Sequence, residues 1–143
     1  MVKPNASATL YNRWRNPQTG KDEYRPVYLE AVHWESREGA NVASSGLANA
    51  DVLLMIVWLN VHAEGRAYVR PKEYARLSQE NIDKHWTISK GIDRVVKGKV
   101  DGAAVITDIK QITNNYDDCF AISTADTMDF GPRYAWHIEA GGK

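Results

Sequence analysis

The chain has 143 residues, a formal net charge of zero at pH 7 and a single cysteine, Cys119. This length fits one domain, residues 1–143, whose core is large enough to fold without disulfides or metal ions. Zero net charge argues against a protein whose main task is to hold nucleic acid by its phosphates, and one cysteine cannot form an internal disulfide. We therefore expect Cys119 to be a small buried residue in a protein of a reducing compartment.

The beginning of the chain lacks the apolar segment of a signal peptide. The longest apolar run, residues 52–59, is too short to span a bilayer. We expect a soluble protein that is made in the cytoplasm and has no membrane partner.

Strand-forming residues recur along the chain. Strand-forming residues predict strands at 8–14, 24–35, 119–124 and 134–139, and the continuous apolar run within 51–62 predicts a strand buried on both faces. In the second of these, Val27, Leu29, Ala31 and His33 share one face, and Tyr28, Glu30, Val32 and Trp34 share the other. A helix is the rival interpretation of 51–62, but its valines, isoleucine and tryptophan favour a strand.

The segments between these strands are turns, short helices and one long loop. Residues 16–22 form a turn cluster, and 36–50, rich in Gly, Ser and Asn, are expected to be a long, mobile loop. Pro71 at a first helical position predicts a helical turn over 71–77, and Thr107 can cap a second one with Ile109, Ile112 and Tyr116 on one side.

The stretch from Trp86 to Val100 predicts a β-hairpin or two strand ends at a tight turn. Gly91 and Gly98 are its turn points, and its charged residues are expected on a solvated face. The final residues, Gly141 to Lys143, are expected to fray. Together these elements predict a mainly β domain, either a small barrel or a sandwich, with one or two short helical turns and a long loop.

No motif for a nucleophile, a phosphate-binding loop or a metal site occurs in the sequence. The four histidines are scattered, and the paired aspartates, Asp117 with Asp118 and Asp126 with Asp129, lie in polar turns that predict solvated carboxylates. We therefore predict no catalytic residues, no cofactor and no metal, and hence no enzymatic activity.

Opposite charges are segregated along the chain. The balances are +3 over residues 1–25, −4 over 26–65, +5 over 66–100 and −4 over 101–143. If these blocks occupy different faces, identical subunits could dock a basic side on an acidic side; folding could instead interleave them into a mixed surface. The residues we assign to such a subunit interface are Trp14, Arg15, Arg70, Arg76, Asp117, Asp118 and Asp126.

The chain also has five tryptophans and seven tyrosines. Such residues on strands belong either to the core and to subunit interfaces or, alternatively, to a surface that stacks the bases of a single-stranded nucleic acid.

Several short segments, in matching order over most of the chain, carry a family resemblance: Thr9-Leu10-Tyr11-Asn12-Arg13, Val32-His33-Trp34, Pro71-Lys72-Glu73-Tyr74, Trp86-Thr87-Ile88, Lys90-Gly91, Val95-Val96-Lys97-Gly98 and Trp136-His137-Ile138-Glu139-Ala140-Gly141-Gly142-Lys143. The chain resembles small phage and prophage proteins encoded among the head-to-tail joining genes of tailed phages that infect Gram-positive bacteria.

This resemblance implies a virion protein of the neck, a head-completion or stopper-like subunit of a homo-oligomeric ring beneath the portal and adaptor. Its partners would be the neighbouring connector and tail proteins and the genomic DNA, bound without sequence specificity. The loop toward the DNA channel would contain Arg37, Gly39, Asn41, Ser44, Ser45, Gly46 and Asn49. A tail-terminator or minor capsid protein and an oligonucleotide-binding barrel remain alternatives.

Overall fold

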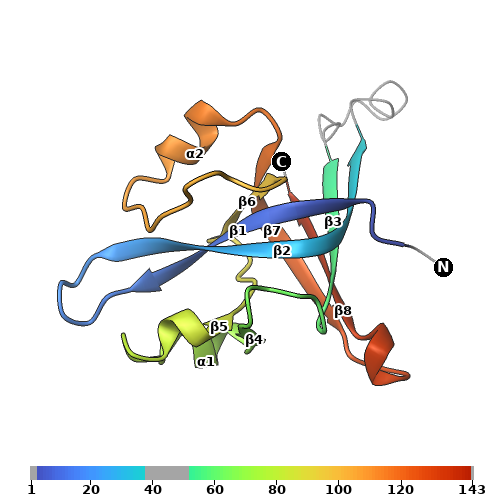
Figure 1. The fold of residues 1–143 in the computed structure, drawn as a ribbon, viewed down its shortest axis with the longest axis horizontal. Helices are drawn as coiled ribbons and strands as arrows, with labels where there is room; N and C mark the ends of the chain where they lie inside the picture. The colour runs from blue at the N-terminus through green and yellow to red at the C-terminus, as the bar shows by residue number, and fades with distance from the viewer. Residues whose placement is uncertain (1–2, 38–51, 143) are drawn as a thin grey trace.

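Six strands form a closed antiparallel barrel in a computed structural model that describes residues 3–37 and 52–142 (Figure 1). The order around the barrel is β1-β2-β3-β8-β7-β6. The bounds are Ala6–Arg15 for β1, Asp22–Arg37 for β2, Val52–Trp58 for β3, Arg94–Lys97 for β6, Cys119–Met128 for β7 and His137–Gly142 for β8. The prediction of a mainly β protein is confirmed, and the barrel is the architecture found.

The remaining elements are short and lie outside the barrel. Strands β4 (Ala67–Tyr68) and β5 (His85–Trp86) form a parallel pair. Helix α1 is Pro71–Ala75, helix α2 is Lys110–Asn115, and two 3-10 turns are Ile82–Lys84 and Arg133–Ala135. None of the helices in the described part of the chain has the length and apolar character needed to cross a bilayer.

The barrel interior is filled by apolar side chains from all six strands. Leu10, Leu29, Met55, Ile122 and Ile138 are fully buried there and belong to one cluster. Alternation along each strand points every second residue into this space, so a barrel of six strands leaves room for side chains only.

Strand β2 changes the face that it buries halfway along its length. Two residues of β1, from Ala6 to Ala8, span the same distance as three of β2, from Leu29 to Val32, which is a β-bulge. Val32 is therefore buried like Leu29, although it lies three positions further along the strand, where regular alternation would place it on the other face. The prediction that Ala31 and His33 share the face of Leu29 is wrong for this reason.

The prediction of a hairpin over Trp86–Val100 is also wrong. Strand β5 pairs with β4, whereas β6 pairs with β1 and β7. Gly91 and Gly98 are nevertheless turn points, since their φ angles are +77° and +86°, a region that favours glycine. The chain turns after Ile88 and enters the barrel at Arg94.

Three smaller predictions need correction. The last strand begins at His137, because Tyr134 lies in a 3-10 turn, and it continues through Gly141 and Gly142, which pair with β3 instead of fraying. Thr107 does not cap α2; the Asp108 side chain accepts a bond from the Lys110 N–H at 3.0 Å. Cys119 is only partly buried, and its Sγ donates to the Tyr116 carbonyl at 3.3 Å.

Candidate functional site

The β1–β2 hairpin extends beyond the barrel as an arm, residues 12–24 (Figure 1). Strand β1 pairs with β6 only over residues 8–11, but it pairs with β2 as far as Arg15 and Asp22. The turn at its end is held by the Asn16 side chain, which accepts a bond from the Gln18 N–H at 2.9 Å.

One side of the arm packs on α1 and the segment that follows it. Trp14 is 1% exposed, clusters with Tyr74 and Ile82, and its Nε1 donates to the Leu77 carbonyl at 3.2 Å. Arg25 lies over the Trp14 ring, 5.1 Å from its centroid. These contacts hold the arm in one orientation relative to α1.

Arg25 is a buried cation with two acidic partners. Its guanidinium binds the Glu23 carboxylate at 3.0 Å and the Asp83 carboxylate at 2.8 Å, and its side chain is 10% exposed. Nothing in the spacing of these three residues in the sequence predicts the cluster, because Asp83 lies in a segment that reads as a polar connection.

The base of the arm is held by a second buried polar group, Asp93. Its carboxylate accepts bonds from the Asn12 amide at 2.7 Å and from the backbone N–H groups of Arg13 and Ser89, both at 2.9 Å. Burial raises the pKa of Asp93 to about 7, although these donors favour the ionised form. The prediction of a solvated carboxylate at this position is wrong.

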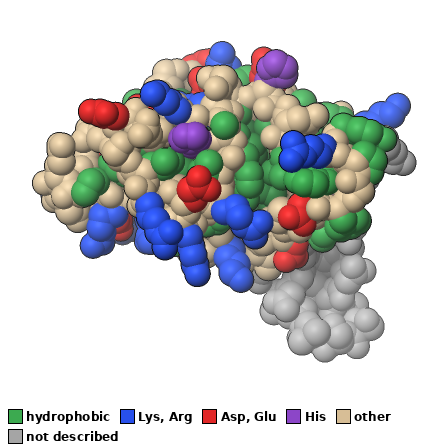
Figure 2. Space-filling model, turned by 90° about the horizontal axis from the view of Figure 1, so that it is seen from below, with side chains coloured by type: hydrophobic (Ala, Val, Ile, Leu, Met, Phe, Trp, Pro, Cys, Tyr) green, Lys and Arg blue, Asp and Glu red, His purple; other side chains and the backbone are tan. Residues whose placement is uncertain are grey.

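A hollow of about 530 Å³, which we call the basic groove, lies between the arm, α1 and the turn before β6. It is lined by Arg13, Trp14, Arg15, Asp22, Pro71, Lys72, Tyr74, Ala75, Ser89, Lys90 and Ile92. Arg15 binds Asp22 at 3.1 Å and Arg13 approaches it at 3.8 Å. Figure 2, which looks from the α1 side, shows Lys and Arg side chains gathered along one rim of the molecule.

The structure places two of the predicted interface residues, Trp14 and Arg15, at this groove. Arg70 and Arg76 are exposed and flank α1, but they do not line the groove. Sequence analysis did not single out Lys72 or Lys90, which complete its positive charge.

The predicted acidic interface residues are not brought together. Asp117 and Asp118 are exposed just before β7, and Asp126 is exposed near its other end. The separation of Asp118 and Asp126 is about 26 Å, from the rise of an extended strand.

The end of β7 and the turn that follows it, residues 126–134, which we call the acidic tip, expose two aromatic rings. Phe130 is 71% exposed and Tyr134 is 68% exposed. Asp126 and Asp129 are exposed beside them, and Arg133 lies over the Trp136 ring at 5.4 Å from its centroid. The aromatic residues of this segment were not predicted as functional, and their place in a turn was the available signal.

The predicted channel-loop residues lie mostly outside the described part of the chain. Arg37 ends β2, and Gly39, Asn41, Ser44, Ser45, Gly46 and Asn49 belong to residues that the structure does not describe.

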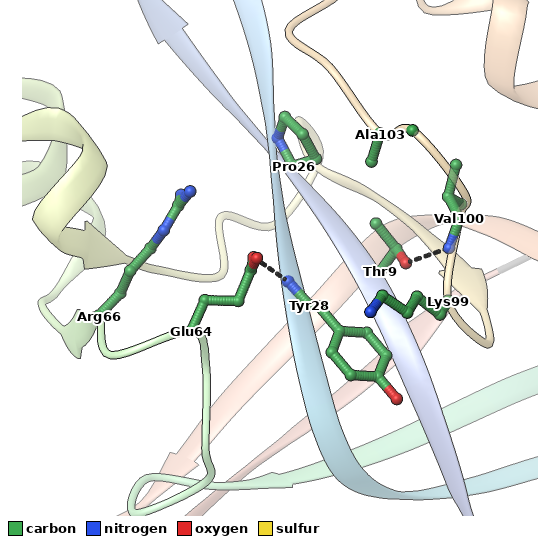
Figure 3. A pocket seen from close by; sticks show the side chains of 9 residues that line it. Thr9, Pro26, Tyr28, Glu64, Arg66, Lys99, Val100 and Ala103 are labelled. Carbon is green, nitrogen blue, oxygen red and sulfur yellow. Dashed lines mark hydrogen bonds between the residues drawn. The ribbon is translucent and has the colours of Figure 1, made fainter.

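A second hollow, of about 210 Å³, lies beside β2 (Figure 3). Three of its polar groups already have partners: Glu64 accepts the Tyr28 N–H at 2.9 Å, Thr9 accepts the Val100 N–H at 3.1 Å, and the Lys99 Nζ lies 5.2 Å from the centroid of the Tyr28 ring. Glu64 also has a φ of 57°, which is uncommon for a residue other than glycine. These contacts hold the segment that contains Glu64 against β2 and the segment that contains Val100 against β1.

Within the described residues, no three His, Cys, Asp or Glu side chains lie close enough to hold a metal ion. The groups that the basic groove offers are cations and apolar surfaces, which suit recognition of an acidic, aromatic partner.

Comparison of the chain with curated proteins and with solved structures found no significant match. One family model matches residues 3–143, and its description is a family of unknown function. Because this match covers nearly the whole chain, the protein belongs to the DUF6751 family.

Proposed function

We propose that this protein is a head-completion or stopper-like subunit of a phage head-to-tail connector ring. The observation that carries the proposal is the arm, which leaves the barrel and is fixed in place by Trp14, Arg25 and Asp93. A subunit that works by shape needs such a projection, because a rigid contact loses less conformational entropy on assembly than a flexible one.

The filled barrel supports a structural role. Its interior is occupied by side chains such as Leu10, Met55 and Ile138 and therefore leaves no space there for a ligand. The surface features are the basic groove and the acidic tip, which are suited to contacts between proteins.

The strand ends that flank the predicted channel loop are compatible with this role. Arg37 and Val52, which flank residues 38–51, pair with each other at the end of β2 opposite the arm. One subunit could therefore use its arm side for contacts with protein and the opposite end for the DNA channel. The genomic DNA, the adaptor and the tail proteins are the partners in this proposal, and the virion neck is the location.

The oligonucleotide-binding alternative has one observation in its favour, the cations of the basic groove. Single-stranded nucleic acid also needs exposed aromatic rings for its bases. The aromatic residues at the groove, Trp14 and Tyr74, are buried. Affinity for single-stranded DNA that falls steeply with salt would favour this alternative.

The proposal is tested by deleting the gene from a phage that encodes this chain and imaging the particles. We expect tailless heads that lose their DNA, and restoration by the wild-type gene. A gene whose arm is shortened, with residues 15–22 replaced by a two-residue turn, should fail to restore tails. Intact, tailed virions without the protein would contradict the proposal; DNA-filled heads with tails of abnormal length would point to the tail-terminator alternative.

A further inference from the structure

We infer that neighbouring copies of this chain are joined by the acidic tip of one copy seated in the basic groove of the next. The inference rests on the proposed function, since it supplies the contact that would build the ring. The partner at the groove is therefore a second copy of the chain, and the segment that enters is residues 126–134.

The groove offers both charge and apolar surface. Lys72 and Lys90 are exposed at its rim, and among the described residues neither forms an ion pair. Pro71 and Ile92 contribute partly buried apolar surface. Its volume of about 530 Å³ is in the range of sites that enclose several groups of a ligand.

The tip has the complementary composition. Phe130 and Tyr134 are two of the three large hydrophobic residues that the described surface exposes, and Asp126 and Asp129 are exposed in the same segment. Exposed aromatic rings beside carboxylates are typical of a contact that is buried when a partner binds.

Charges of the opposite sign at each surface do not cancel this match. Asp22 in the groove is engaged by Arg13 and Arg15. On the tip, Arg133 keeps its positive charge over the Trp136 ring, but the two carboxylates of Asp126 and Asp129 leave the segment with a net charge of −1. The cations that remain at the groove therefore face the carboxylates of the tip.

The two surfaces lie toward opposite ends of the long axis of the molecule, the arm at one end and the β7–β8 connection at the other (Figure 1). A contact between two different surfaces of the same chain is heterologous, and it generates a ring when the rotation closes. Each subunit then uses its groove once and its tip once. Because one tip in one groove is a small interface, we expect a weak pairwise contact that becomes stable when the ring closes.

Disulfide crosslinking of the full chain tests this contact. In a Cys119→Ser background, one variant carries Lys72→Cys with Asp129→Cys, and a matched control carries Lys72→Cys with Asp108→Cys, at another exposed aspartate. We expect mild oxidation to give covalent multimers at least tenfold faster for the 72/129 pair than for the control. Phe130→Ala in the 72/129 variant should remove most of this advantage.

A charge exchange gives a second measurement in the Cys119→Ser background. Lys72→Glu alone and Asp129→Lys alone should each reduce association in sedimentation velocity, and the two together in one chain should restore it. Lys72 and Asp129 are both exposed, so the melting temperature should equal that of the Cys119→Ser background.

Equal crosslinking of the two cysteine pairs would overturn the inference, whether or not the wild-type chain forms rings. Salt-sensitive binding of duplex DNA that Lys72→Glu weakens, together with no multimers in the absence of DNA, would assign the groove to nucleic acid and would also overturn the inference. Because the gene deletion tests the connector role separately, tailless heads together with equal crosslinking would leave the proposed function standing and reject only this contact.

Discussion

Asp93 and Arg25 are charged residues inside the protein, and both stabilise the arm. Asp93 joins the base of the arm to the turn before β6 through Asn12 and Ser89, and Arg25 joins its outer part to Asp83. Removing one member of such a network leaves the others buried without partners, which is more destabilising than the loss of one average hydrogen bond. Stability should therefore be sensitive to these two residues.

The free energy of unfolding should depend on pH through Asp93. Its pKa is raised by burial to about 7 in the folded protein. The stabilisation from its protonated form is therefore fully present below the pKa of the unfolded chain and is lost as the pH rises through 7. Relative to Asp93→Asn, the wild type should lose up to about 1.4 kcal/mol per pH unit between about pH 4 and 7.

Urea unfolding of both proteins across this range measures the difference. Ser89→Ala keeps the backbone N–H donor to Asp93 and should retain the slope of the wild type. A difference in the free energy of unfolding between the wild type and Asp93→Asn that does not change with pH would contradict the prediction.

Replacing Arg25 by methionine should destabilise the fold by about 2–4 kcal/mol, because Glu23 loses its buried partner and the Trp14 ring loses its cover. Arg15→Met is the matched control, since Arg15 is exposed and its pairing with Asp22 should contribute less than about 1 kcal/mol. The midpoint of urea unfolding decides between them, and equal shifts would show that Arg25 has no special role.

At the scale of elements, the sequence predicted the strands but not their partners. Alternation identifies β1 and β2, strand-forming residues identify β7, and the continuous apolar run identifies β3, because each of these is a local property of the sequence. The sequence pattern cannot place β5 beside β4, because strand pairing depends on the path of the chain. It also cannot locate the bulge in β2, because no residue type near Ala31 marks the point where the alternation shifts. The same limit applies to the groove: its cations come from the arm, α1 and the turn at Lys90, and only the fold joins them.

Strand β8 closes the barrel through Gly142, where backbones approach closely. A Cβ atom at Gly142 would overlap the Ala121 carbonyl oxygen and lie 2.6 Å from the Phe120 ring, whereas at Gly141 its closest contact would be the Thr124 hydroxyl at 2.8 Å. The Thr124 side chain can rotate, but the backbone at Ala121 must move with β7.

Gly142→Ala should therefore lower the free energy of unfolding by about 1–3 kcal/mol more than Gly141→Ala. Both substitutions remove the same backbone freedom from the unfolded chain, so their difference isolates the overlap. Thermal unfolding of the two variants measures it. Equal melting temperatures would show that β7 and β8 can move apart at Gly142 and Ala121 without a loss of stability.

At the scale of the whole molecule, folding brings two cations from each of the two basic blocks of the sequence to the basic groove. Arg13 and Arg15 come from the first block, and Lys72 and Lys90 come from the third. The acidic block of residues 101–143 supplies the tip as well as the separate pair Asp117 and Asp118. Positive charge is therefore concentrated at the groove, whereas the negative charge of residues 101–143 is divided between the acidic tip and the pair Asp117 and Asp118.

This distribution predicts how association responds to salt. If Lys72 and Lys90 attract the carboxylates of the tip, raising the ionic strength from about 0.1 M to about 1 M shortens the screening length from about 10 Å to about 3 Å and slows encounter. The Lys72→Cys/Asp129→Cys pair has lost two of the attracting charges. The better probe is Ala75→Cys with Pro132→Cys in the Cys119→Ser background, which keeps every charge and both exposed aromatic rings of the tip. Its crosslinking should slow several-fold with added salt, and Lys90→Gln should reduce that dependence. A rate that is independent of salt would show that the contact is apolar only.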